Sequence, residues 1–225
     1  MLVLLLGLAF GADRVAVGIA EDSVGRELAA RGGLQGQPGV DIAGFPFLTQ
    51  ALADRYDDVR ISLSADQLGQ PEGTRADVSL RGVQVPLSSV LSGSVQQIPV
   101  ERIEGTATLS YALLATQLGP DTILRREADQ LRITRTVELL GRQVPLTAAG
   151  RVTVEGDEVV IDVGTAEGAG VELPGFLVQQ AGALLDLRYP VPALPFGLRL
   201  TGVTPGADGV VLRLAAENTV VGAVE

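Results

Sequence analysis

The sequence predicts an α+β fold, in which a long N-terminal amphipathic helix packs against a curled antiparallel β-sheet with two or three short helices. Three observations predict it: helical periodicity is confined to the N-terminal part, period-two alternation dominates from Val40 onward, and short helical stretches interrupt the strands. With 225 residues and no low-complexity linker or internal repeat, the chain suits one domain.

The N-terminal helix is predicted from apolar residues that recur every three or four positions, while most charged residues lie elsewhere on its surface. Gly32 and Gly33 end the pattern, as C-terminal glycines do. We expect the apolar stripe to pack on the core. Its members are Val17, Ala20, Val24 and Leu28.

The first ten residues form a separate apolar segment. Leu2 to Phe10 carries no charge, is shorter than the ~20 residues that span a bilayer, and has the length of a signal-peptide core. Met1 directly precedes it without a basic stretch, so we expect the true start to lie upstream. We therefore predict an exported periplasmic or envelope protein, with residues 1–10 as a signal or anchor segment and 11–225 as one domain. The alternative is the buried start of a helix in a cytosolic protein.

Two hairpins are predicted in the second half of the chain. Alternating apolar residues flank Glu155-Gly156-Asp157, and a second pair of runs flanks the turn residues between Pro205 and Gly209. Other alternating runs lie at 59–63, 78–80 and 131–139, the last interrupted by Arg135. Period-two alternation is typical of antiparallel sheets with one apolar face.

Three short helices are predicted, at Pro86 to Leu91, Tyr111 to Leu118 and Pro174 to Leu185. So few helices cannot cover the apolar face of a long sheet. The sheet must curl on itself and the first helix, or leave an elongated apolar groove. Tyr189 to Phe196 is rich in proline, which suits an edge or a bend over an opening.

Composition excludes several function classes. The chain has no Cys and no His, which removes disulfides, thiolate nucleophiles, zinc sites of the usual kind and His-dependent triads. Its net charge is −10 and aromatic residues make up only 4%, which argues against nucleic acid as a partner. We expect no metal, no cofactor and no catalytic residue. Asp57 and Asp58 are adjacent on a strand and point to opposite faces, and Ser88, Ser89 and Ser92 have no activating base.

Gly44 to Gln50 reads GFPFLTQ and is followed by ALADRYDDV up to Val59. This stretch, after an N-terminal helix that ends in glycines, resembles the LmeA family of actinobacterial phospholipid-binding envelope proteins, most sharply over Gly44 to Leu63. The resemblance implies export, a tubular lipid-binding-like fold, and binding of phospholipids, phosphoinositides included. It also implies a role in the assembly of mannosylated lipoglycans of the lipomannan type, and it carries no catalytic residues.

The residues of this stretch also predict a local conformation without reference to any family. Pro46 makes Phe45 extended, so Phe45 and Phe47 are expected on one side and Leu48 opposite. The rings line the mouth of a lipid groove or, alternatively, plug one end of the core. The apolar groove is predicted to comprise Phe45, Phe47, Leu48, Leu113, Leu114, Phe176, Leu177 and Phe196.

A basic cluster is the candidate for an anionic headgroup, because the guanidinium fork suits phosphate. It comprises Arg125, Arg126, Arg132 and Arg135. The alternative is a solvated sheet face balanced by Glu127, Asp129 and Glu138.

The leading function hypothesis is non-catalytic phospholipid binding or transfer by a monomer at a membrane surface, with envelope-biosynthesis proteins as partners. A scaffolding protein that holds a protein partner on a flat apolar patch is the second hypothesis. A glycan-processing enzyme, with carboxylates clustered in a polar cleft, is the third.

Overall fold

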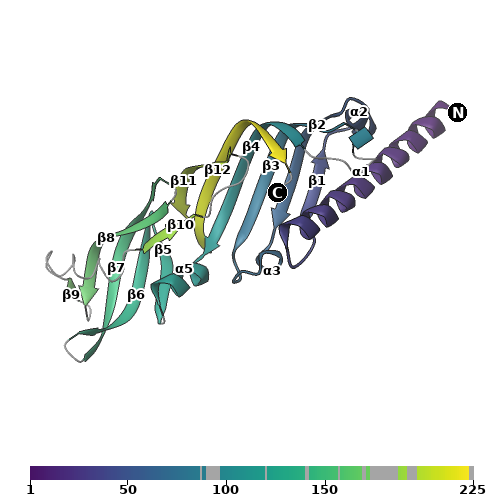
Figure 1. Cartoon of the computed structure of the whole chain (residues 1–225). Coiled ribbons are helices and arrows are strands. Elements are labelled where there is room, and N and C mark those ends of the chain that lie inside the picture. Colours follow the sequence, from purple (N-terminus) through teal and green to yellow (C-terminus); the bar gives the residue numbers. More distant parts are fainter. Residues whose placement is uncertain are drawn as a thin grey trace.

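The computed structural model describes residues 1–86, 88–89, 97–119, 121–139, 142–156, 158–168, 171–172, 187–191 and 197–222. It has an N-terminal helix, several short helices and curled antiparallel sheets, which confirms the predicted α+β class. The molecule is elongated, with two sheets arranged end to end and α5 at their junction (Figure 1).

The first sheet, sheet A, has six antiparallel strands. It joins four strands from the first half of the sequence to the two strands nearest the C-terminus, because β4 pairs with β12. In spatial order its strands are β1 (Gly39–Ala43), β2 (Arg55–Leu63), β3 (Arg75–Gln84), β4 (Gln97–Ser110), β12 (Gly209–Gly222) and β11 (Arg199–Pro205).

Sheet B is also antiparallel and is built mainly from sequential strands. Its order is β10 (Leu187–Pro190), β8 (Glu158–Gly168), β7 (Arg142–Glu155), β6 (Gln130–Leu139) and β5 (Thr122–Glu127), and β9 (Val171–Glu172) pairs with β8. The proline-rich segment begins in β10, at the edge of this sheet, as its prolines predict.

Both predicted hairpins are confirmed. Glu155 pairs with Glu158 across the first turn, and Pro205 pairs with Val210 across the second. Strand β6 runs through Arg135 without a break. The alternation of apolar residues is therefore a better guide to these strands than the single charge within one of them.

The helices are α1 (Leu2–Gly32), α2 (Phe47–Leu52), α3 (Ala65–Leu68) and α5 (Tyr111–Leu118). Helix α5 has the predicted bounds, because the Ser110 hydroxyl accepts the Leu113 N–H at its start. Of the predicted helix at Pro86 to Leu91, Ser88 and Ser89 are helical and the rest is only partly described. The predicted helix at Pro174 to Leu185 lies outside the described residues.

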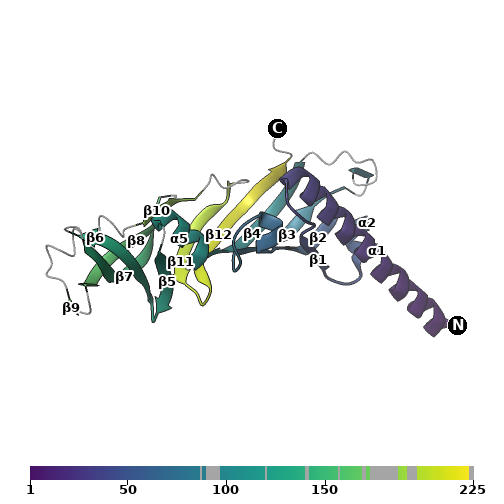
Figure 2. The same ribbon diagram turned by 90° about the horizontal axis from the view of Figure 1, so that it is seen from below.

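Helix α1 is longer than expected, since residues 2–10 continue directly into it. It packs beside β1 and α2, while its N-terminal end projects away from the sheets (Figure 2). Val17 is buried as predicted, but Val24 is exposed. None of the described helices is long and apolar enough to cross a membrane.

Two buried clusters form the core. The first lies under α1 and α2 and includes Val17, Phe47 and Ile103. The second lies between α5, sheet B and β12, and includes Leu114, Ile133 and Leu212. Since the two clusters occupy the same apolar face of sheet A at different positions along its strands, a stretch of that face lies between them.

Candidate functional site

A row of small and aliphatic residues crosses sheet A between the two cores. Direct cross-strand pairing joins its members in sequence from β1 to β11. We call this the central row: Val40, Ile61, Val78, Gly105, Leu214 and Leu200. Five strand spacings of about 4.8 Å make it about 24 Å long.

The side chains of the central row are not buried, although buried residues flank the row on both sides. Its five side chains are all half-exposed, whereas Ile42 and Ile103 of the adjacent row belong to the first core and Leu212, on the other side, belongs to the second. The row therefore offers aliphatic surface that the protein's own core does not fully bury. Such surface is suited to apolar ligands.

Gly105 makes a shallow interruption in the row. A Cβ at this position would lie 3.6 Å from Leu214 Cβ and from Val78 Cγ2, which is ordinary contact. The glycine is therefore not required by lack of space for a methyl group. It leaves the middle of the aliphatic surface lower than its flanks.

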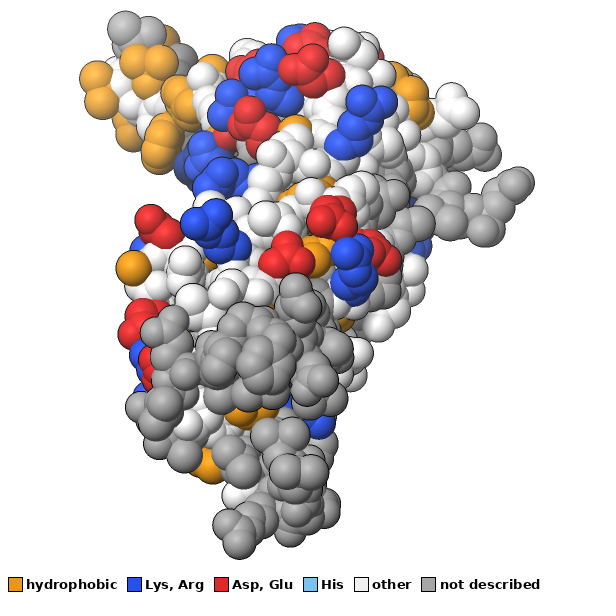
Figure 3. All heavy atoms as spheres, turned by 90° about the vertical axis from the view of Figure 1, so that its left-hand side faces the viewer, with side chains coloured by type: hydrophobic (Ala, Val, Ile, Leu, Met, Phe, Trp, Pro, Cys, Tyr) orange, Lys and Arg blue, Asp and Glu red, His pale blue; other side chains and the backbone are white. Residues whose placement is uncertain are grey.

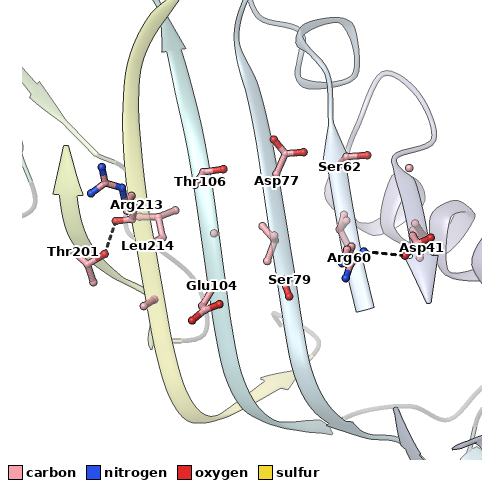
Figure 4. A pocket seen from close by; sticks show the side chains of 16 residues that line it. Asp41, Arg60, Ser62, Asp77, Ser79, Glu104, Thr106, Thr201, Arg213 and Leu214 are labelled. Carbon is pink, nitrogen blue, oxygen red and sulfur yellow. Dashed lines mark hydrogen bonds and ion pairs between the residues drawn. The ribbon is translucent and has the colours of Figure 1, made fainter. Parts of the chain in front are cut away.

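The opposite face of sheet A is polar. The side chains on that face alternate along the strands with the central row. Five members of the central row, Val40, Ile61, Val78, Gly105 and Leu214, line a hollow of about 740 Å³ together with their neighbours along the strands. On the polar face the Arg60 guanidinium lies 3.8 Å from Asp41, and the Thr201 hydroxyl donates to the carbonyl of Arg213 (Figure 4). The same guanidinium lies 2.7 Å from Asp58. Ion-paired side chains do not suit acyl chains, so the polar face is not expected to form the apolar groove. The groove stays a prediction.

The GFPFLTQ stretch belongs to an elbow that follows β1 and includes α2, which we define as residues 44–52. The expectation that both rings share one side is wrong: Phe47 is 7% exposed within the first core, whereas Phe45 is 62% exposed. The reason is that Phe47 is the first residue of α2, so the chain turns between the two rings. Leu48 is also exposed.

Asp13 joins the elbow to the first helix. Its side chain is almost fully buried, and one carboxylate oxygen accepts the Leu48 N–H at 2.9 Å while the other accepts from Arg14 at 2.6 Å. Burial raises the pKa of Asp13, but the hydrogen bonds from Arg14 and from the Leu48 and Phe47 N–H groups outweigh it, so the net pKa is lowered. The helical pattern predicts that most charged residues lie off the packed face, and Asp13 is an exception.

Apolar side chains also gather outside the core around this elbow. The rings of Phe10 and Phe45 lie 5.6 Å apart between centroids, and the Arg14 guanidinium lies 5.9 Å and 5.4 Å from them. The aromatic pair thus connects the projecting end of α1 to the elbow. An Asp-Arg pair directly after an apolar run was the sequence signal for this junction.

The other predicted groove residues fall into two groups. Leu114 is fully buried in the second core, and Leu113, next to it on α5, is half-exposed. Phe176, Leu177 and Phe196 lie outside the described residues. The groove role of these residues stays a prediction.

The predicted headgroup arginines divide between the two faces of sheet B. Arg125 and Arg132 are cross-strand partners on one face, while Arg126 and Arg135 belong to the other by alternation. Arg132 pairs with Glu127 at 2.8 Å and with Glu167 at 3.8 Å, and Arg126 donates to the Ala128 carbonyl at 2.8 Å. A common headgroup site for all four stays a prediction.

The residues that the structure describes do not form a metal-binding cluster. Among those residues, no group of three or more acidic side chains is arranged to hold a metal ion. Asp58, one of the two adjacent aspartates, accepts the Ser79 hydroxyl and pairs with Arg60. Its carboxylate oxygens are thus engaged in structural contacts within sheet A.

Comparison with known protein families gives a match over most of the chain. A family model described as LmeA-like phospholipid-binding matches residues 11–215. No curated protein matches the chain, and no solved structure does. The matched range covers sheet B, all of sheet A except the C-terminal part of β12, and most of α1.

Proposed function

The chain belongs to the LmeA-like phospholipid-binding family, and we propose that it holds the acyl chains of a phospholipid along the central row of sheet A without chemistry of its own. The observation that carries this placement is the half-exposed aliphatic surface between two buried cores. At about 24 Å the row is longer than the ~15 Å that the chains of one leaflet occupy.

The energetics favour the central row over the polar face of sheet A. Each methylene removed from water contributes about 0.8 kcal/mol. On the opposite face the same ligand would have to displace water from ion-paired Arg60 and Asp41. This desolvation costs free energy that no new polar contact offsets. The headgroup of a lipid on the central row would therefore lie toward one edge of sheet A.

The nature of the headgroup is part of the proposal. We propose an anionic phospholipid, with phosphoinositides as the first candidates, carried or sensed at a membrane surface in the cell envelope. Its place in lipoglycan assembly and its export are proposed on the same family membership. The apolar character of residues 2–10 supports export or anchoring.

A scaffolding role is the alternative. It uses the same central row to hold a protein partner, and it differs in requiring no bound lipid. The two proposals therefore separate on the composition of the purified protein.

The test is native mass spectrometry of the protein purified from an actinobacterial host, followed by organic extraction and lipid identification. We expect one phospholipid per chain and uptake of labelled phosphatidylinositol. Protein that is free of lipid and takes up no labelled lipid overturns the proposal and leaves the scaffold. The Gly105→Leu variant, described below, then locates the site.

A further inference from the structure

We propose that the projecting end of α1 and the elbow enter the interface of a phospholipid bilayer together, with Arg14 at the level of the phosphates. This membrane contact extends the proposed function. It rests on that function only because the bound lipid would come from the same bilayer. It assigns a membrane contact to the elbow, whose Leu48 lies 35 residues after Asp13 in the sequence.

The end of α1 is apolar on every side. Val3 is 81% exposed and Leu8 is 75% exposed, with Leu4 and Leu6 also exposed between them. Residues 2–12 carry no ionisable side chain. Figure 3 shows the hydrophobic side chains gathered on this protruding end. A protein partner covers one face of a helix, whereas a helix that is apolar all round fits a surrounding of hydrocarbon.

The elbow extends this surface beside the helix. Phe45 is 62% and Leu52 is 77% exposed, and the Phe45 ring contacts Phe10. Because Asp13 binds the Leu48 N–H, the elbow is held at a fixed position against α1. The two elements therefore present one continuous apolar surface.

Charge complements a phosphate layer at the boundary of this surface. The whole chain has a net charge of −10, yet in residues 1–20 the only ionisable side chains are Asp13, which is buried, and Arg14. The Arg14 side chain is 42% exposed beside the two rings. A guanidinium with an apolar stem suits the level where hydrocarbon meets phosphodiester groups.

The chain has no Trp, so a single introduced tryptophan reports its own position. Phe45→Trp in the full chain is to be mixed with vesicles of phosphatidylcholine and phosphatidylglycerol, with and without brominated acyl chains. Ile123→Trp is the matched control, because Ile123 is similarly exposed but lies on β5 in sheet B. We expect a blue shift and bromine quenching for the Phe45→Trp variant alone. If vesicles leave the emission of that variant unchanged, the proposal is overturned.

A second measurement separates the elbow from the helix. Phe45→Ser combined with Leu52→Ser is expected to lower vesicle cosedimentation at least tenfold, while Ile123→Ser combined with Val220→Ser leaves it unchanged. Both pairs are exposed, so neither change costs core packing. Equal cosedimentation of the two double variants overturns the proposal. Bound phospholipid is measured on the same samples: its retention in the elbow variant shows that membrane contact, and not lipid binding, is lost.

Discussion

The carboxylate of Asp13 accepts the backbone N–H of Leu48 at 2.9 Å, and so joins the first helix to the start of the second. A buried carboxylate is stable only when its oxygens are paired. Here Arg14 and the first N–H groups of α2 supply the partners. The position of the elbow thus depends on one side chain.

Asp13→Ala is expected to lower the Tm by several degrees, because it leaves the Leu48 N–H without its acceptor. Asp13→Asn keeps an acceptor oxygen and is expected to lower Tm less. Asp22→Ala, at an exposed acid on the same helix, is the control. Thermal unfolding followed by circular dichroism measures all three, and equal Tm values would show that the contact adds no stability.

The same residue predicts a dependence of stability on pH. The pKa of Asp13 is lowered in the folded protein, so the stability it contributes is fully present above the ordinary carboxyl pKa of about 3.9 and is lost as the pH falls through the lower folded value. The difference in free energy of unfolding between the parent and Asp13→Asn is expected to be constant from about pH 5 to 8 and to shrink below about pH 4. Urea unfolding at a series of pH values measures it, and a difference that grows at low pH contradicts the assignment.

Local features of this fold were predictable from sequence, and long-range ones were not. The bounds of α5 followed from Ser110 before it and Gly119 after it, and the hairpins followed from their turn residues. The rings of Phe45 and Phe47 were misplaced because alternation was assumed where a helix begins. Asp13 was missed because its partner lies in another element.

The central row could not be predicted for a different reason. It depends on β12 lying beside β4, a pairing between strands about a hundred residues apart that joins Gly105 to Leu214. Each strand shows that one of its faces is apolar, but only the register shows which residues of different strands form one row. The few helices predict an apolar surplus, but its location depends on the order of the strands in the sheet.

Leu114→Ala and Leu113→Ala distinguish core from binding surface on α5. Leu114 is fully buried in the second core, so its truncation is expected to cost about 2–5 kcal/mol in the free energy of unfolding. Leu113 is half-exposed, so its truncation is expected to lower the free energy of unfolding by less than about 1 kcal/mol. Chemical denaturation measures both. Similar costs for the two variants would mean that α5 is packed differently from the arrangement described.

Gly105→Leu tests the acyl-chain site directly. The new side chain would rise from the middle of the central row, where a Cβ fits at 3.6 Å from its neighbours. If it displaces about two methylenes of a bound chain, the loss is about 1.6 kcal/mol, or about tenfold in affinity. Thr106→Leu is the matched control, since the adjacent residue of β4 points to the opposite, polar face of sheet A. Titration with a fluorescent phospholipid compares them. If only Thr106→Leu weakens binding, the acyl chains lie on the polar face, because a leucine at position 106 can obstruct a ligand only on that side of sheet A.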